Sequence, residues 1–310
     1  YESENDSFIY DYFKNNPKPD FGFSPDADFP LIYGEKGRFA ADMSLNSWDD
    51  NDILDSIMGG SIYNAVLGEV KALIKKDLSV EFNDFLLNNN LKGSINKIND
   101  NLFELNIIGK STHAMEPEKG INAGTYMCLF LKQYSNNPMV HFISDYLHNG
   151  HYLNNLALDY NDKEMGPVTL CIGIMNIKKN DTRVTLDVRY PINYDISHMK
   201  NILSNMLDKF DIRMVYSETK EPHYVNPNSD LVQKLLNSYR KYTNDFTNLP
   251  KTIGGGTYAK VMDKGVAFGM LFQDDQALEH QANESLSLDR LFQAILIYFD
   301  AILQLGEIDA

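Results

Sequence analysis

The sequence is poor in cysteine and has no long uninterrupted apolar run. Only Cys128 and Cys171 occur among 310 residues, and both lie in apolar segments typical of buried thiols. Two cysteines cannot build a four-cysteine zinc site or a disulfide framework, so any metal ion would need carboxylate and imidazole ligands. The absence of about 18 consecutive apolar residues argues against a membrane span. This cysteine usage favours a cytoplasmic location.

Basic residues are also scarce. The chain has 28 Lys and Arg against 43 Asp and Glu, which gives a net charge of −15. Nucleic-acid binding needs clustered positive charge, so we expect no nucleic-acid partner. The acidity is explained by solubility alone. With 43% hydrophobic and 23% charged residues, the composition is that of a globular protein, and its length is enough for two domains.

Strand-like and helix-like segments alternate near both ends of the chain. ADFPLI and VAFGMLF are typical of short buried strands. SDLVQKLLNSYRKYTN and SLSLDRLFQAILIYFDAILQL have helical periods, with Ser229 and either Ser285 or Ser287 as predicted caps. This alternation predicts an α/β architecture for the two ends.

The middle of the chain has a different pattern. VTLCIGIMNIKKNDTRVTLDVRYP predicts a β-hairpin, and GINAGTYMCLFLKQYS and HMKNILSNMLDKF predict helices. AVLGEVKALIKKDL also predicts a helix, because apolar residues recur at helical spacing: Val66, Val70, Leu73 and Ile74. We therefore expect residues 36–224 to form an inserted α+β domain, which splits an α/β domain made of residues 1–35 and 225–310.

Two residues could bind a metal ion. His280 lies in LEHQANES, just before the closing helix, where ligands of open α/β sheets collect. Asp26 lies in the tight SPDA loop before a predicted strand. Taken alone, a single histidine is more often a core or surface residue, and an aspartate in such a loop is more often a turn former. Together, imidazole and carboxylate groups suit zinc.

Further candidates for ligand binding lie in loops and at strand ends. Gly254–Gly256 precede Thr257, where the backbone could approach a ligand, although a plain tight turn explains them equally well. His113 follows a strand, and Asn64 is a turn or cap residue by default. Arg189 ends a strand, and a buried arginine there needs an acidic partner, for which a substrate carboxylate is one candidate. The histidines without comparable context are expected at the surface: His141, His148, His151, His198 and His223.

Six motifs together resemble the M20 metallopeptidase family. GFSPDADFPLIYGEKG, GGSIYN, GKSTHAMEPEKGINA, LDVRYP, IGGGTYA and EHQANES occur in the family's order over about residues 8–305. The resemblance is greatest to the PepV-like dipeptidases, which cleave Xaa-His and other dipeptides. It implies a zinc-peptidase-like catalytic α/β domain, split in sequence by an α+β lid. It also implies two zinc ions, a small peptide substrate and a monomer.

The resemblance also implies roles for individual residues. Asp26 and His280 would each bind one zinc ion. His113 would stabilise the oxyanion of the tetrahedral intermediate, and Asn64 would contact the substrate from the lid. Arg189 would hold the free C-terminal carboxylate. Backbone groups of three further residues would help it: Gly255, Gly256 and Thr257.

The sequence departs from the family pattern in three places. The family's earlier His-x-Asp motif and bridging aspartate have no counterpart in this sequence. Counting back from Asp26 puts Glu2 at the general base but Ser3 where the family has a zinc-binding glutamate. Lys260 stands where the family has an arginine, which keeps the charge and loses the bidentate fork.

These departures set the expectations for function. We expect a zinc-dependent dipeptidase whose natural product is longer at its N-terminus, and weak zinc binding by the present chain, because a catalytic zinc takes about three protein ligands. One alternative is a catalytically degenerate relative that binds peptides or a partner, which the serine at the ligand position favours. Another is an N-acyl amino-acid hydrolase, which the large lid disfavours.

Overall fold

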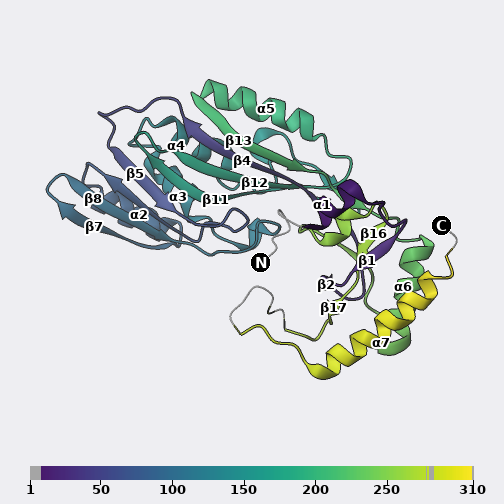
Figure 1. Cartoon of the computed structure of the whole chain (residues 1–310). Coiled ribbons are helices and arrows are strands. Elements are labelled where there is room, and N and C mark those ends of the chain that lie inside the picture. The colour runs from purple at the N-terminus through teal and green to yellow at the C-terminus, as the bar shows by residue number, and fades with distance from the viewer. Residues whose placement is uncertain (1–7, 277, 279–282, 309–310) are drawn as a thin grey trace. The chain divides into compact units, whose positions relative to one another are not determined.

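The computed structural model describes residues 8–276, 278 and 283–308. The chain divides into two compact units (Figure 1): unit 1 is Tyr1–Lys36 with Pro222–Ala310, and unit 2 is Gly37–Glu221. The sequence patterns place these boundaries near residues 36 and 224. Both units mix helices with strands, which confirms the α/β fold class. The roles of the units as catalytic domain and lid stay predictions.

An eight-stranded sheet is the frame of unit 2. Its strand order is β13-β4-β12-β11-β5-β6-β8-β7, and every neighbouring pair is antiparallel. Its strands, in chain order, are β4 (Gly37–Leu45), β5 (Leu54–Gly59), β6 (Glu69–Ile74), β7 (Lys92–Asn99), β8 (Leu102–Ile108), β11 (Thr169–Lys178), β12 (Arg183–Tyr190) and β13 (Ile212–Lys220). A separate antiparallel pair consists of β9 (Asn161–Asp162) and β10 (Gly166–Pro167).

The helices of unit 2 share one core with the sheet. Buried side chains from each of the four α-helices belong to the same apolar cluster as Phe39 of β4 and Leu186 of β12. These helices are α2 (Ser79–Asn88), α3 (Ala123–Leu131), α4 (Pro138–Phe142) and α5 (Ile196–Lys209). Shorter turns are the 3-10 helices η1 (Pro117–Lys119) and η3 (Asn154–Leu156) and the π-helical turn η2 (Ile143–Leu147). The predicted hairpin and the predicted helices at α3 and α5 are confirmed.

The helix predicted within AVLGEVKALIKKDL is wrong. Residues Glu69–Ile74 form strand β6, which lies between β5 and β8 in the sheet. Val70, Ala72 and Ile74 are buried and alternate with Glu69 and Lys71, which are exposed. A short apolar run fits periods of 2 and 3.6 almost equally, and here pairing on both sides selects the strand.

Unit 1 contains a mixed five-stranded sheet. The strand order is β1-β16-β3-β14, and β15 also pairs with β3. β1 is parallel to β16, β15 is parallel to β3, and the other pairs are antiparallel. The strands are β1 (Gly22–Ser24), β3 (Ile32–Glu35), β14 (His223–Tyr224), β15 (Lys251–Ile253) and β16 (Gly265–Ala267), and a separate parallel pair is β2 (Ala27–Asp28) with β17 (Met270–Leu271).

Two predicted strands of unit 1 are shorter than expected. ADFPLI is split into β2 and β3 at Phe29 and Pro30, since proline has no N–H to donate to a strand ladder. VAFGMLF is also split, into β16 and β17, at Phe268 and Gly269. The helices of the unit are α1 (Phe8–Asn15), α6 (Asp230–Thr243), α7 (Leu288–Leu305) and the 3-10 helix η4 (Tyr258–Val261). Within the part of the chain that the structure describes, no helix is both long and apolar enough to cross a membrane.

Ser229 and Ser287 stand at the N-cap positions of α6 and α7, as predicted. Neither side chain makes a capping hydrogen bond, however. The Ser229 hydroxyl is buried without a hydrogen-bond partner in the structure. The predicted positions are therefore right, but the expected capping bonds do not form.

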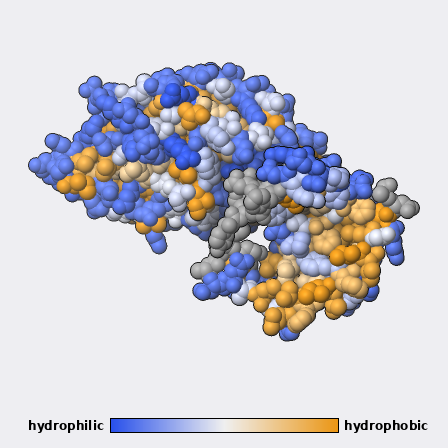
Figure 2. All heavy atoms as spheres, viewed as in Figure 1, coloured by the Kyte–Doolittle hydropathy of each residue, from blue (hydrophilic) through white to orange (hydrophobic). Residues whose placement is uncertain are grey.

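Helix α7 is apolar on two sides. Ala294, Ile297 and Ala301 are buried and belong to the same core cluster as residues of α6. The other side exposes a stripe of large apolar side chains: Leu288, Phe292, Ile295, Leu296, Phe299, Ile302 and Leu303. Apolar surface gathers over α7 in Figure 2. A contiguous exposed stripe of this kind marks an interaction surface, and in the isolated chain it favours aggregation.

Replacing part of the stripe tests this conclusion. In the double variant Phe292→Gln and Phe299→Gln, we expect less binding of an apolar fluorescent dye and less light scattering. The free energy of unfolding should change by no more than about 1 kcal/mol, because both side chains are exposed. Ile297→Gln, on the buried side, is the matched control and should destabilise the fold. Unchanged dye binding in the double variant would contradict the conclusion.

Candidate functional site

A short backbone pairing brings Asn64 and His113 together in unit 2. Ala65 and His113 form an isolated antiparallel bridge. The Ala114 N–H donates to the Asn64 carbonyl at 2.9 Å, and the Val66 N–H donates to the Thr112 carbonyl at 2.8 Å. The Asn64 amide nitrogen consequently lies 3.4 Å from His113 Nε2. The backbone pairing thus places two side chains that are distant in the sequence next to each other.

The hydrogen bond at His113 Nδ1 defines the tautomer of the neutral ring. The backbone N–H of Met115 donates to Nδ1 at 3.1 Å, so this nitrogen is an acceptor. A neutral imidazole has one donor and one acceptor, and Nε2 must therefore carry the hydrogen. The Asn64 amide nitrogen is also a donor, so two adjacent N–H groups can be offered to one acceptor oxygen. This is the arrangement that stabilises an oxyanion.

The surroundings of His113 favour its neutral form. Desolvation lowers the pKa of His113 below the usual value of 6.5, and the positive charge of Arg189 lowers the pKa further. The carboxylates of Asp187 and Glu116 oppose this effect. A neutral His113 near neutral pH keeps Nδ1 available as an acceptor and Nε2 as a donor.

Arg189 lies at the end of β12 and is paired with an internal carboxylate. Its Nε donates to Asp187 Oδ1 at 2.5 Å, and a terminal nitrogen lies 3.4 Å from Oδ2. On the neighbouring strand β4, Arg38 Nε donates to Asp187 Oδ2 at 2.6 Å. The Asp187 side chain has no exposed surface. The acidic partner that a buried arginine requires is therefore Asp187, so a substrate carboxylate would be an additional partner of Arg189.

The sequence motifs did not single out Asp187 as a site residue. It lies two residues before Arg189 in LDVRYP, so the two side chains share one face of the strand. The alternation of side chains along a strand was the sequence signal that could have identified Asp187 as a partner of Arg189. Asp187 holds the guanidinium group that the resemblance assigns to carboxylate binding.

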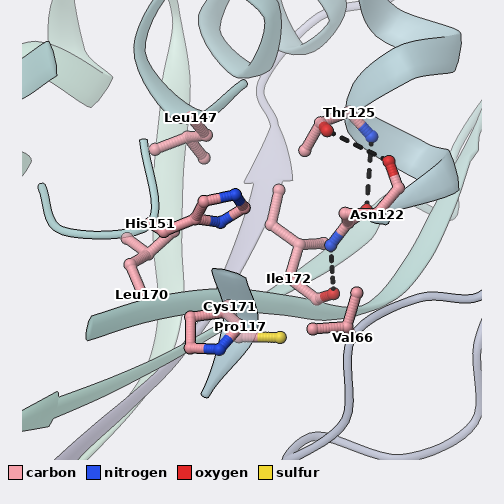
Figure 3. A pocket seen from close by; sticks show the side chains of 9 residues that line it. All are labelled: Val66, Pro117, Asn122, Thr125, Leu147, His151, Leu170, Cys171 and Ile172. Atoms are coloured by element: carbon pink, nitrogen blue, oxygen red, sulfur yellow. Dashed lines mark hydrogen bonds between the residues drawn. The ribbon is translucent and has the colours of Figure 1, made fainter. Parts of the chain in front are cut away.

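A small cavity beside the Asn64–His113 loops is too small to hold a dipeptide. It has a volume of about 10 Å³, which is room for about one water molecule. Its lining includes Asn122, Thr125, His151 and Cys171 (Figure 3). Burial raises the pKa of the Cys171 thiol to about 12, which makes it a poor nucleophile.

The predicted site residues of unit 1 lie in loops. Asp26 is exposed between β1 and β2, and Gly255 and Gly256 lie between β15 and η4. The segment that follows the glycines and Thr257 is the single 3-10 turn η4. These residues belong to unit 1, whereas Asn64, His113 and Arg189 belong to unit 2.

Thr257 binds a buried carboxylate of unit 1. Its backbone N–H donates to Glu35 Oε2 at 3.0 Å, and its hydroxyl donates to Oε1 at 2.5 Å. Glu35 is buried, and desolvation raises its pKa against the opposing charge of Lys260, which lies 3.7 Å away. The Thr257 N–H is thus already used within the protein, and Glu35 is a second acidic residue that the motifs did not single out.

The predicted metal ligands are only partly within the described chain. Glu2 and His280 lie outside the described residues, as does Ser3. Among the residues that are described, no group of three or more His, Cys, Asp or Glu side chains is placed to hold a metal ion. Asp26 alone offers one carboxylate, whereas a catalytic zinc takes about three protein ligands. The described residues therefore do not by themselves form a metal centre.

Most of the histidines expected at the surface are partly buried. His141 Nε2 lies 2.9 Å from the Ser135 carbonyl, and His223 Nε2 lies 2.6 Å from the Gly265 carbonyl. His148 and His151 are also partly buried, and desolvation lowers the pKa of both. Only the prediction for His198 holds, since that residue is exposed.

Comparisons with known proteins find similar proteins that are named as dipeptidases. No protein-family model matches it. A Staphylococcus aureus protein named "Putative dipeptidase" is 36% identical over an alignment of 309 residues, which covers 95% of this chain and 66% of that protein. The chain thus spans 66% of the length of the curated relatives it matches.

Two solved structures are also similar to the chain. One is the aminoacylhistidine dipeptidase from Vibrio alginolyticus, with 13% identity, a TM-score of 0.47, and coverage of 96% of this chain and 67% of the other. The other is an M20 family metallo-carboxypeptidase from Sulfolobus solfataricus, with 15% identity, a TM-score of 0.45, and coverage of 96% and 66%.

The pKa of His113 can be measured by NMR titration. We expect it below 6.5 in the folded protein and near 6.5 in urea, and we expect Arg189→Gln to raise the folded value by removing a positive charge. Since the folded pKa is lowered, the contribution of His113 to stability is present above pH 6.5 and is lost as the pH falls through the folded pKa. A folded pKa above 6.5 would contradict the described surroundings.

The buried carboxylate of Asp187 should be important for stability. Asp187→Asn removes the charge between two guanidinium groups, and we expect it to lower the free energy of unfolding by about 3–5 kcal/mol, because two positive charges lose their buried partner. Asp84→Asn on the exposed side of α2 is the control. Urea denaturation measures both, and a loss below about 1 kcal/mol for Asp187→Asn would show that the pairing is unimportant.

Proposed function

We propose that the chain belongs to the same family as these Staphylococcus aureus relatives, each named "Putative dipeptidase", and that it acts in a metal-dependent dipeptidase of the M20 type. The sequence similarity, which extends over 95% of the chain, supports this proposal. The proposed substrate is a small peptide, and the proposed protein is a cytoplasmic monomer. Residues 37–221 would supply the lid, and the remaining residues would belong to the catalytic domain.

The Asn64–His113 pair is the observation that carries the proposal. Attack on a peptide bond puts negative charge on the carbonyl oxygen, and two N–H donors aimed at one point stabilise that charge. Asn64 Nδ2 and His113 Nε2 are 3.4 Å apart, and the Met115 N–H holds the imidazole in the required tautomer. We assign these two side chains to the oxyanion of the tetrahedral intermediate.

Arg189 is the proposed binding group for the substrate carboxylate. It is close enough to His113 to lower the pKa of the histidine, and Asp187 fixes its guanidinium plane. A dipeptide has its free carboxylate one residue beyond the scissile carbonyl. A group that binds a carboxylate, close to donors that bind a carbonyl oxygen, therefore fits such a substrate. Backbone groups of Gly255 and Gly256 are the proposed helpers of Arg189.

The metal part of the proposal rests on the resemblance. Two zinc ions are proposed, with Asp26 and His280 as ligands and Glu2 as the general base. Among these three residues, only Asp26 lies in the described chain, and it supplies one carboxylate as a metal ligand. The described residues therefore support two proposed roles for this chain: substrate binding and oxyanion stabilisation.

One set of assays separates the proposed function from its two alternatives. The protein at its natural length is incubated with added zinc, manganese or cobalt and offered free dipeptides or N-acyl amino acids. Faster cleavage of free dipeptides supports the proposal, and faster cleavage of N-acyl amino acids supports an acylase. Binding of dipeptides without any turnover supports the degenerate relative, which Ser3 at a ligand position favours.

Removing the His113 side chain tests its proposed role. We expect His113→Ala to lower kcat by roughly 10²–10³-fold, because a positioned donor to the oxyanion is lost. The change in KM should be smaller, since the donor acts mainly in the transition state. His198→Ala, at an exposed histidine of the same unit, is the control. An unchanged kcat in His113→Ala would refute the oxyanion role.

A further inference from the structure

The loop that carries Asn64 lies directly against strand β11. Gly60 and Gly173 make this close approach possible. A Cβ atom at Gly173 would come too close to the carbonyl oxygens of Ile62 and Tyr63, and a Cβ atom at Gly60 would come too close to the Gly173 carbonyl. Gly60 also has a φ of +75°, which favours glycine. Backbone packing therefore sets how near the loop lies to the sheet.

The Tyr63 side chain attaches this loop to two strands of the sheet. Its hydroxyl donates to Asp42 Oδ1 on β4 and accepts a hydrogen bond from an Arg183 terminal nitrogen on β12 at 2.9 Å. Arg183 Nε in turn donates to Asp42 Oδ2 at 2.9 Å. The three polar groups form a closed triangle that joins the loop to the polar face of the sheet.

The Tyr63 ring lies near two guanidinium groups. Arg183 and Arg38 have their central carbons 5.2 and 5.8 Å from the ring centroid, within the range of cation–π attraction. Arg38 also donates to Asp187, the partner of Arg189. Tyr63 thus connects the Asn64 loop to the same charged group that holds the proposed carboxylate-binding arginine.

Tyr63 attaches the Asn64 loop to the sheet, whereas the two residues before it do not. Ser61 and Ile62 are exposed, so these two side chains bury little surface against the sheet. Asn64 follows Tyr63 directly, and its carbonyl accepts the hydrogen bond from Ala114 that aligns it with His113. A shift of Tyr63 would be passed to Asn64 through one peptide unit.

We propose that Tyr63, held by Asp42 and Arg183, is the positioning residue that keeps the Asn64 amide beside His113. This inference rests on the proposed oxyanion role of that pair. Tyr63 would act through Asn64 and would not touch the substrate. Burial and the Asp42 hydrogen bond both raise the pKa of Tyr63, so its hydroxyl remains a donor over the pH range of the experiments below.

The test removes only the Tyr63 hydroxyl. Tyr63→Phe keeps the ring near both arginines and loses the hydrogen bonds to Asp42 and Arg183, and Tyr216→Phe, at an exposed tyrosine on β13, is the matched control. The ¹⁵N chemical shifts of His113 report its tautomer and its pKa without any substrate. We expect the Nε2 signal of His113 and the side-chain amide signals of Asn64 to shift in the folded Tyr63→Phe variant, because the amide moves away from the ring, whereas the Met115 N–H keeps the tautomer. Tyr216→Phe should resemble the wild type.

Kinetics give a second readout of positioning. If the protein cleaves dipeptides, kcat should fall by about 10- to 100-fold in Tyr63→Phe with a smaller change in KM, since a displaced donor weakens transition-state contacts most. Failure of the wild type to cleave dipeptides would refute the proposed function while the NMR test still decides the inference. Unchanged His113 shifts in a folded Tyr63→Phe variant would overturn it.

A second variant covers the case in which Tyr63→Phe does not fold. Arg183→Lys keeps the positive charge but loses the fork that joins Tyr63 and Asp42. Arg183 is about half exposed, with 46% of its side chain accessible, so the change is better tolerated. We expect a shift of the His113 signals in the same direction as for Tyr63→Phe. Signals identical to the wild type in this folded variant would overturn the inference.

Discussion

Asp187, a carboxylate with no exposed surface, lies between the guanidinium groups of Arg38 and Arg189 on neighbouring strands. Burying such a charge is costly, and the cost is offset only when opposite charges and good hydrogen bonds surround it. The rest of the candidate site depends on this arrangement. It fixes the plane of Arg189, places a positive charge near His113, and holds Arg38 near the Tyr63 ring.

In the eight-stranded sheet of unit 2, successive side chains of each strand alternate between a face that packs in the core and a face that carries polar groups. On β4 and β12, Phe39, Leu186 and their neighbours of the same parity face the core that all four helices share. Residues of the other parity, such as Arg38 and Asp187, face the loops that carry Asn64 and His113. One face of the sheet supplies the buried apolar area, and the other supplies a rigid base for polar groups. A site built on strands is positioned more precisely than one built on loops alone.

The sequence predicts much of this fold because strong periodic segments have few alternatives, as in the β11–β12 hairpin and helix α5. It fails at β6, where a short apolar run fits two periods and only pairing decides. Candidate residues at strand ends could be named from motifs, but their partners could not. Glu35 binds Thr257 from far away in the sequence, and the tautomer of His113 depends on a backbone N–H. Such contacts arise only when the chain has folded.

The central claim is that a free carboxylate binds at Arg189, next to the Asn64–His113 donors. The most direct measurement is the affinity of a dipeptide compared with that of the same dipeptide carrying a C-terminal amide, by isothermal titration calorimetry. The account predicts that the free acid binds and that the amide binds at least about 10-fold more weakly, because a charge-assisted hydrogen bond is lost. Equal affinity for the two compounds would contradict it.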